Sequence, residues 1–430
     1  MSVVVLDAPP YLQAITRLDA NSQRVVLTLL DHPITKRLQK IQALGYTTKA
    51  FTSATHTRWD HTLWTIDAMC NLLEASPKIP LEIKTHLLAL VVIQDIGHSA
   101  LSNSLAESFI AESGDQLLQI LPSDKAWTVR IIQSLEKHER LFSQLGLHVD
   151  VIIQLLVGRI PWSKYSWLKR LIEGVLDADR LAYVEQDSGL TLSLPTGRSV
   201  QRIAKSLIHD GPSDSTVIDS GGAESTLEFI KVRGHLYIDV YNNPTKLAWE
   251  FLMRDFLRYL WEHNSTLDDN KYEKPLTVED FLLWTDQRVH EAITELALTD
   301  TTLAEAVRLL KNGELMVAEV TEPQSDSMSF NEIDILLEQL AIETFPKRPM
   351  WVIQSDQLEI PSLYEPNSIL VKDRDGYKPF ERIQPSVAPL VRRLRRRPML
   401  ILPYSSLQAV LKQLVSVGLT LDQLLPITER

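Results

Sequence analysis

The segment KTHLLALVVIQDI, residues 84–96, constrains the fold of this 430-residue chain more than any other. Its apolar residues are spread around the whole helical circumference, which predicts a central helix covered by other helices. The segment ends on Gln94 and Asp95, and Gly97 and His98 follow. Because a buried carboxylate needs a polar partner, we expect neighbouring helices to bring charged side chains to this point.

Two further stretches have the spacing of amphipathic helices, residues 62–75 and residues 167–189. In the second stretch, Asp179 lies four residues after Val175, on the apolar stripe that a helix would turn toward the core. A carboxylate on such a stripe requires a hydrogen-bond network, a cation or a metal. Asp179 is therefore a candidate functional residue.

Short apolar segments at 349–354 and 398–403 predict strands. Segments rich in Gly, Ser, Asp and Asn predict loops. The predicted loops are residues 209–226, 264–275 and 321–332. We therefore expect a mainly α protein in three parts. These are an N-terminal segment at 1–30, a helical core at 31–300 and a smaller α+β region at 301–430.

Composition and charge exclude several classes of protein. Hydrophobic residues make up 44% of the chain and charged residues 23%, as in soluble globular proteins. The net charge of −11 disfavours general binding to nucleic acid. Cys70 is the single cysteine, so no thiolate metal site is expected. The start of the chain does not resemble a signal peptide and the apolar runs are short, so we expect a cytoplasmic protein without a membrane span.

Histidines and carboxylates recur in four separate segments. These are ATHTRWDHTLW at 54–64, QDIGH at 94–98, KHER at 137–140 and DADRLAYVEQDSG at 177–189. The segments fall at the ends or on the buried stripes of different expected helices. A metal ion held between helices uses such a set of side chains.

The ordered motifs resemble the HD-domain superfamily of metal-dependent phosphohydrolases, and more closely its deoxynucleoside triphosphate triphosphohydrolase, or dGTPase-like, branch. The segments HPITKRLQKIQALG at 32–45, RGHLYIDVY at 233–241 and FLLWTDQRVHEAI at 281–293 extend the resemblance over residues 30–295. It implies an HD-domain helical core and an enzyme that hydrolyses a (deoxy)nucleoside triphosphate to nucleoside and triphosphate with a divalent metal.

The resemblance carries over to individual positions. It implies metal ligands at His61, Asp95 and Asp179, with Gln94 as a weak ligand, and it implies that His98 and His138 lie near the bond that breaks. The implied substrate-binding residues are Arg58, Arg180, Tyr183, Asp187, Arg233 and Tyr241.

Five positions depart from the family pattern. Gln94 replaces the histidine of the His-Asp doublet, Asn103 a histidine thought to protonate the leaving group, and Ala43 a pocket glutamine. The last motif is altered at Ala182 and Gln186. One histidine and two carboxylates form a hard donor set, so Mg²⁺ or Mn²⁺ is expected before Fe, Co or Zn. The amide of Asn103 has no proton that titrates near neutral pH, so it is no general acid.

The departures leave two functions open. A divergent metal-dependent hydrolase would keep the groups that hold a nucleotide, and so would a catalytically impaired nucleotide-binding sensor. The arginine-rich run RRLRRRP at 392–398 suggests a solvated or dimer-facing helix end, or else an anion site for a nucleotide or nucleic acid. The resemblance implies a homo-oligomer and a nucleotide ligand, whereas the acidic net charge argues against nucleic acid.

Overall fold

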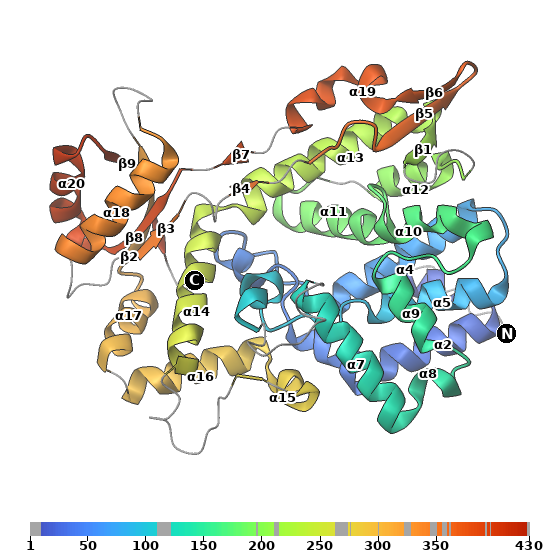
Figure 1. Cartoon of the computed structure of the whole chain (residues 1–430), viewed down its shortest axis with the longest axis horizontal. Coiled ribbons are helices and arrows are strands. Elements are labelled where there is room, and N and C mark those ends of the chain that lie inside the picture. Colours follow the sequence, from blue (N-terminus) through green and yellow to red (C-terminus); the bar gives the residue numbers. More distant parts are fainter. Residues whose placement is uncertain are drawn as a thin grey trace.

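The computed structural model is mainly helical, with small sheets formed largely by its C-terminal third (Figure 1). It describes residues 10–109, 122–194, 197–209, 215–262, 274–275, 277–299, 301–321, 328–344, 351–354, 359–360, 363–391, 394–395 and 397–427. This confirms the predicted class, a mainly α protein with a smaller β part. Over these residues, no helix combines the length and the hydropathy that a membrane span requires.

Most helices precede residue 312. They are α1 (Pro10–Thr16), α2 (Ala20–Asp31), α3 (Pro33–Lys36), α4 (Arg58–Ala75), α5 (Leu81–Ile93), α7 (Ser123–Glu139), α8 (Leu141–Gln144), α9 (Val149–Leu156), α10 (Lys169–Glu173), α11 (Ala178–Thr191), α12 (Gly197–Ser206), α13 (Ala223–His235), α14 (Pro244–Glu262), α15 (Val278–Leu283), α16 (Asp286–Thr299) and α17 (Thr301–Lys311). Helices α18 (Phe330–Thr344), α19 (Phe380–Ile383) and α20 (Leu407–Ser416) follow.

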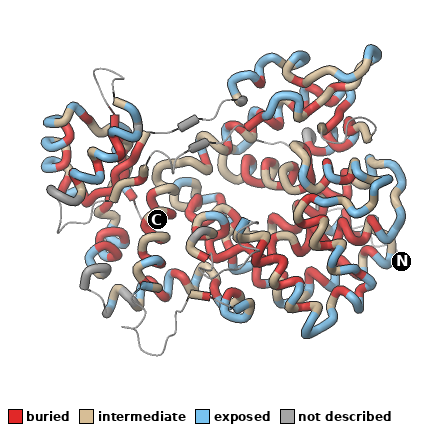
Figure 2. Tube along the Cα trace, viewed as in Figure 1, coloured by how far each residue is buried: buried red, intermediate tan, exposed pale blue. Residues whose placement is uncertain are grey.

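Helix α5 lies at the centre of the main hydrophobic core, as its uniform apolar sequence predicts. It packs against α2, α4 and α9, and every residue from Leu87 to Ile93 is buried. Figure 2 shows the buried positions concentrated along the inner faces of these helices. The helix ends at Ile93 rather than at Ile96, so Gln94 and Asp95 lie in the turn that follows it.

The stretch 167–189 does not form one continuous helix. Helix α10 ends at Glu173, where the extended backbone of Gly174 interrupts the helical path. Helix α11 then starts after Asp177, whose side chain accepts a hydrogen bond from the Arg180 backbone N–H. This break places Asp179 in the first turn of a new helix, close to the helix end.

The last third of the chain forms a four-stranded antiparallel sheet in the order β3-β8-β2-β9. Its strands are β2 (Leu315–Thr321), β3 (Trp351–Ile353), β8 (Met399–Pro403) and β9 (Thr420–Ile427). Helix α18 connects β2 to β3 and α20 connects β8 to β9, which is the split β-α-β arrangement. The sequence predicts both strands of the β3–β8 pair, in which Trp351 lies opposite Ile401.

The chain between β3 and β8 leaves this sheet and returns to the helical core. It forms β4 (Glu359–Ile360), β5 (Ile369–Asp373), β6 (Gly376–Pro379) and β7 (Leu394–Arg395). Strand β5 pairs in parallel with β1 (Thr216–Asp219), which lies within the predicted loop 209–226. In Figure 1, β4 and β7 bridge the C-terminal sheet and α13. The predicted C-terminal region thus contributes to both parts of the molecule.

Candidate active site

Helix α11 presents a row of polar side chains to two adjoining cavities. Asp179, Tyr183 and Asp187 are spaced four residues apart and so lie on one face of the helix. The first cavity has a volume of about 350 Å³ and includes all three residues in its wall. The second cavity has a volume of about 460 Å³ and contains Asp179 and Tyr183. Arg58 and Asn103 also line both cavities, so the two spaces meet at Asp179.

The start of α4 supplies the next two charged residues. Thr57 caps the helix: its hydroxyl accepts a hydrogen bond from the Asp60 N–H, and the Asp60 carboxylate accepts one from the Thr57 N–H. This capping box fixes the first turn, so Arg58 and His61 point toward the turn after α5. The Arg58 guanidinium also donates to Ser102 Oγ at 2.7 Å, which ties α4 to the segment after His98.

The turn after α5 approaches the start of α7 very closely at Gly97. A Cβ atom there would lie 2.2 Å from the Asp124 carbonyl oxygen, so this position requires glycine. The close approach brings Asp124 near His98, with 4.0 Å between Oδ2 and Nε2. His98 Nε2 also lies 3.6 Å from Asp95 Oδ1, and His98 Nδ1 is buried without a hydrogen-bond partner among the described residues.

His61, Asp95 and Asp179 converge, although they are far apart in the sequence. His61 Nε2 lies 3.0 Å from Asp179 Oδ1 and 3.7 Å from Asp95 Oδ2. The Arg58 guanidinium reaches Asp95 Oδ2 at 3.1 Å. Burial alone would raise the pKa of Asp95, but Arg58 and His98 outweigh it and hold that pKa well below its usual range. Asp95 is therefore a carboxylate at neutral pH.

His61 and Asp179 stabilise each other's charged forms. Burial lowers the pKa of His61, but the hydrogen bond to Asp179 and the nearby carboxylates raise it overall. The pKa of Asp179 is lowered, because the His61 contact outweighs the opposite effect of burial. The side chain of Asp179 is nevertheless 41% exposed, whereas that of Asp95 is 10% exposed. Asp179 is thus the more accessible of the two acids.

The donor set suits a hard divalent cation such as Mg²⁺ or Mn²⁺. The 3.0 Å between His61 Nε2 and Asp179 Oδ1 is the distance of an ordinary hydrogen bond. Gln94 donates its amide N–H to Asp179 Oδ1 at 3.0 Å, and a rotated amide would present its oxygen instead. Across the described ranges, no group of three or more His, Cys, Asp or Glu side chains is already arranged to hold a metal ion. These side chains contact one another instead.

The other predicted arginines lie along the second cavity. Arg180 ion-pairs with Asp177 and donates to the Gly174 carbonyl at 3.0 Å. Arg233 of α13 donates through Nε to the Tyr183 hydroxyl at 2.8 Å and through Nη1 to the Leu363 carbonyl at 2.9 Å. The segment that returns from the C-terminal sheet therefore helps to position Arg233. Arg58, Arg180 and Arg233 line this cavity and are suited to donate to phosphate, but its wall also carries the acids Asp95, Asp124, Glu173, Asp177 and Asp179.

Asp187 lies in the wall of the first cavity, within a largely buried polar network. Its Oδ1 is 2.9 Å from His56 Nε2, and its Oδ2 accepts a hydrogen bond from the Tyr241 hydroxyl at 2.5 Å. Burial and the adjacent Asp187 charge raise the pKa of Tyr241 well above its usual value, so this hydroxyl keeps its proton. The sequence predicts Asp187 and Tyr241 at the site, but His56 receives no role from it.

The structure does not bring His138 to the other predicted residues. His138 lies exposed at the end of α7, fourteen residues from Asp124, a separation of about 21 Å along a helix. It lines neither cavity. Asp124 and Lys125, at the opposite end of the same helix, line the second cavity instead. His138 and Asp124 thus lie at opposite ends of α7, and only the end with Asp124 borders a cavity.

The sequence also singled out Asn103 and the arginine-rich run at 392–398. Asn103 is exposed and borders both cavities, as expected for the position that it matches. The arginine run falls partly on Arg392, Arg393 and Arg396, which lie outside the described residues.

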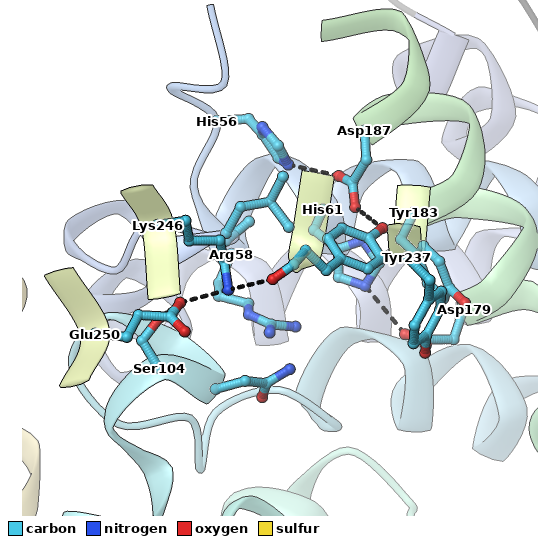
Figure 3. A pocket seen from close by; sticks show the side chains of 14 residues that line it. His56, Arg58, His61, Ser104, Asp179, Tyr183, Asp187, Tyr237, Lys246 and Glu250 are labelled. Carbon is cyan, nitrogen blue, oxygen red and sulfur yellow. Dashed lines mark hydrogen bonds and ion pairs between the residues drawn. The ribbon is translucent and has the colours of Figure 1, made fainter. Parts of the chain in front are cut away.

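Lys246, Glu250 and Ser104 also line the first cavity (Figure 3) and no motif indicated them. The sequence gives no sign of Ser104 at the site. Lys246 and Glu250 are four residues apart, but that spacing is common on exposed helix faces and does not indicate a cavity.

Comparison with known proteins supports the fold but does not assign a family. No family model matches the chain. It is 24% identical over 260 residues to the uncharacterized protein YwfO of Bacillus subtilis and 25% identical over 232 residues to the uncharacterized protein MG461 of Mycoplasma genitalium. Those matches span 57% and 50% of this chain. The aligned part covers 57% and 51% of those relatives, little more than half of their length.

Solved structures show a similar architecture over most of the chain. A phosphohydrolase from Bacteroides thetaiotaomicron superposes with a TM-score of 0.66 and 19% identity, over 88% of this chain and 94% of that one. A hypothetical protein from Aquifex aeolicus gives a TM-score of 0.68 and 19% identity, over 90% of this chain and 94% of that one. At this identity the likeness shows the fold alone, and that fold is one found in a phosphohydrolase.

Proposed function

We propose that this chain is a metal-dependent phosphohydrolase that cleaves a (deoxy)nucleoside triphosphate to nucleoside and triphosphate. The observation that carries the proposal is the convergence of His61, Asp95 and Asp179 where the two cavities meet. The three arginines in the wall of the second cavity can bind phosphates, and the tyrosine-rich wall of the first cavity suits a nucleoside. The fold of the Bacteroides phosphohydrolase and the motif resemblance support the same class.

In this proposal His61, Asp95 and Asp179 would hold a divalent cation, which would supply Lewis-acid activation of the phosphate and of the attacking water. Arg58, Arg180 and Arg233 bind the phosphates and counter the charge that develops as the bond breaks. His98 lies beside Asp95, where it can donate a proton to the leaving nucleoside oxygen. Asn103, which borders both cavities, can bind the same oxygen but cannot protonate it.

A nucleotide-binding sensor without catalytic activity is the second candidate. The observation that favours it is the hydrogen bond from the Gln94 amide to Asp179, which occupies the oxygen that faces His61. A neutral amide in place of a histidine weakens any metal site, by about 10-fold or more. The sensor would bind the triphosphate with the same arginines but would not cleave it.

One experiment separates the two functions. The purified protein is incubated with each of the four deoxynucleoside triphosphates in Mg²⁺ or Mn²⁺, while nucleoside release and nucleotide binding are measured in parallel. Release of nucleoside with intact triphosphate, abolished by Asp95→Asn, supports the hydrolase. Binding without release supports the sensor. If the protein neither binds nor cleaves any of the four, both proposals are wrong.

A further inference from the structure

The turn before Asn103 has a backbone conformation that is uncommon for residues with a side chain. Leu101 and Ser102 have φ angles of 55° and 53°, so two consecutive non-glycine residues lie in the left-handed region. Both are buried, with 3% and 1% of their surface exposed. Such strain persists only where the surrounding structure enforces it, and it concentrates at functional sites. The turn is therefore expected to have fixed contacts on both of its sides.

Asp286, at the start of α16, holds one side of the turn. Its Oδ1 accepts a hydrogen bond from the Leu101 N–H at 2.6 Å, and its Oδ2 accepts one from the Gln42 N–H at 2.7 Å. The carboxylate thus joins the turn to the segment before α4. A carboxylate suits this place because both of its oxygens accept, whereas an amide would turn an N–H toward one of the two donors.

Ser102 connects the turn to Arg58. Its hydroxyl donates to the Gln42 carbonyl at 2.6 Å and accepts from Arg58 Nε at 2.7 Å. On the other side of the guanidinium, Nη1 donates to Asp95 Oδ2 at 3.1 Å. These two contacts fix the plane of the guanidinium. Among the contacts between described residues, Nη2 keeps its protons for a ligand in the cavities that Arg58 lines.

We propose that Ser102 is a positioning residue for Arg58, and that Asp286 holds Ser102 in place through the strained turn. This inference rests on the proposed function, because it takes Arg58 to bind a phosphate. The Ser102 proton is directed to Gln42, so a lone pair of the hydroxyl faces Nε. A guanidinium that is held before the substrate arrives loses little further freedom on binding, which favours both binding and the chemical step.

The test is a double-mutant cycle of Ser102→Ala and Arg58→Met in the full-length protein with Mn²⁺. Ser102→Ala removes one hydrogen bond to a charged group, so kcat/KM for nucleoside release should fall by about 10- to 100-fold. Methionine keeps much of the arginine's length but has no N–H to position. Adding Ser102→Ala to Arg58→Met should therefore change kcat/KM by less than about twofold. Thermal melting of each variant checks folding.

Asp286→Asn gives a second, independent variant. It should also lower kcat/KM by about 10-fold or more, and again only while Arg58 is present. Glu291→Gln, an exposed position on the same helix, is the matched control for the change from acid to amide and should leave kcat/KM unchanged. The dependence on Arg58 separates positioning from stability, because a change that merely loosens the fold lowers activity in both backgrounds.

Each outcome decides the proposal. An equal fall caused by Ser102→Ala in both backgrounds would overturn it, and so would no fall in either. If the wild-type protein cleaves none of the four deoxynucleoside triphosphates, the proposed function fails, and the same cycle is measured by equilibrium binding of inorganic triphosphate. Binding that Ser102→Ala weakens only when Arg58 is present would support positioning. Equal affinity in the wild type and Ser102→Ala, or no binding by the wild type, would overturn it.

Discussion

The two cavities hold their carboxylates in different ways. In the first, Asp187 is 3% exposed and has a donor on each oxygen, from His56 and Tyr241. In the second, Asp179 is 41% exposed and shares one oxygen between His61 and Gln94. A carboxylate that accepts a hydrogen bond on each oxygen has a fixed orientation and is preorganised for binding. An exposed carboxylate can accept a new ligand. Under the proposed function, the first cavity would be the binding end of the site and the cluster at Asp179 its reactive end.

The largest expected effect comes from Asp179→Asn. The amide removes one anionic donor of the proposed metal site, so nucleoside release should fall by at least about 100-fold. The exposed side chain should make the change mild for folding, which thermal melting would check. Asp150→Asn, at an exposed position on α9, should leave release unchanged. Full activity in Asp179→Asn would remove the distinction between the two ends.

The next test compares His98 and His138. The motif resemblance implies that both lie near the bond that breaks, but only His98 lines a cavity in the structure. His98→Ala removes an imidazole beside Asp95 and should lower kcat by about 100-fold, as expected for a general acid. His138→Ala alters an exposed side chain outside both cavities and should change kcat by less than about twofold. Equal losses in both variants would contradict the assignment of His98 as the proton donor.

Gln94→His should strengthen the reactive end. An imidazole supplies the nitrogen donor that the amide lacks, so Mn²⁺ should bind about 10-fold more tightly and release at limiting metal should rise. The metal concentration that gives half-maximal release measures the change. An unaltered metal dependence would show that position 94 does not contact the cation.

Tyr241→Phe should weaken the binding end alone. It removes the hydroxyl that fixes Asp187 Oδ2 but leaves the ring in place. Losing one such hydrogen bond costs about 1–3 kcal/mol, so KM should rise about 5- to 100-fold while kcat falls much less. A fall in kcat with KM unchanged would place this hydroxyl at the reactive end instead.

The smallest expected effect lies on α11 but outside both cavities. Burial, together with the neighbouring Asp67 carboxylate, raises the pKa of Glu185 to about 7. The fold therefore favours the protonated acid, and the stability that it contributes is lost as pH rises through about 7. Glu185→Gln should raise the melting temperature more at pH 8 than at pH 5. An equal change at both pH values would contradict the raised pKa.

The grouping of several residues at the reactive end could be predicted from the sequence, because it follows from patterns within single helices. The apolar run of α5 ends on Asp95, and Asp179, Tyr183 and Asp187 repeat every four residues, so elementary helix geometry places them on a shared face. The KHER motif places His138 away from these residues, because a short motif does not say which end of a helix faces the core. Lys246 and Glu250 could not be found, since only the packing of α14 shows that this ordinary pair is buried.

The fold was predictable in its class and less so in its connections. The strands at 351–353 and 399–403 follow from their apolar residues. Strand β1 was hidden in a polar segment, because it is completed by β5, more than 140 residues later. The helix break at Gly174 was missed because the apolar spacing continues across it, while the Asp177 cap starts a new helix.

The central claim is that His61, Asp95 and Asp179 share one divalent cation, and Mn²⁺ titration followed by electron paramagnetic resonance tests it most directly. The wild-type protein should remove one Mn²⁺ per chain from the free signal, and His61→Ala and Asp179→Asn should each weaken that binding by at least about 10-fold. No saturable binding, or binding that is the same in the wild type and both variants, would contradict the account.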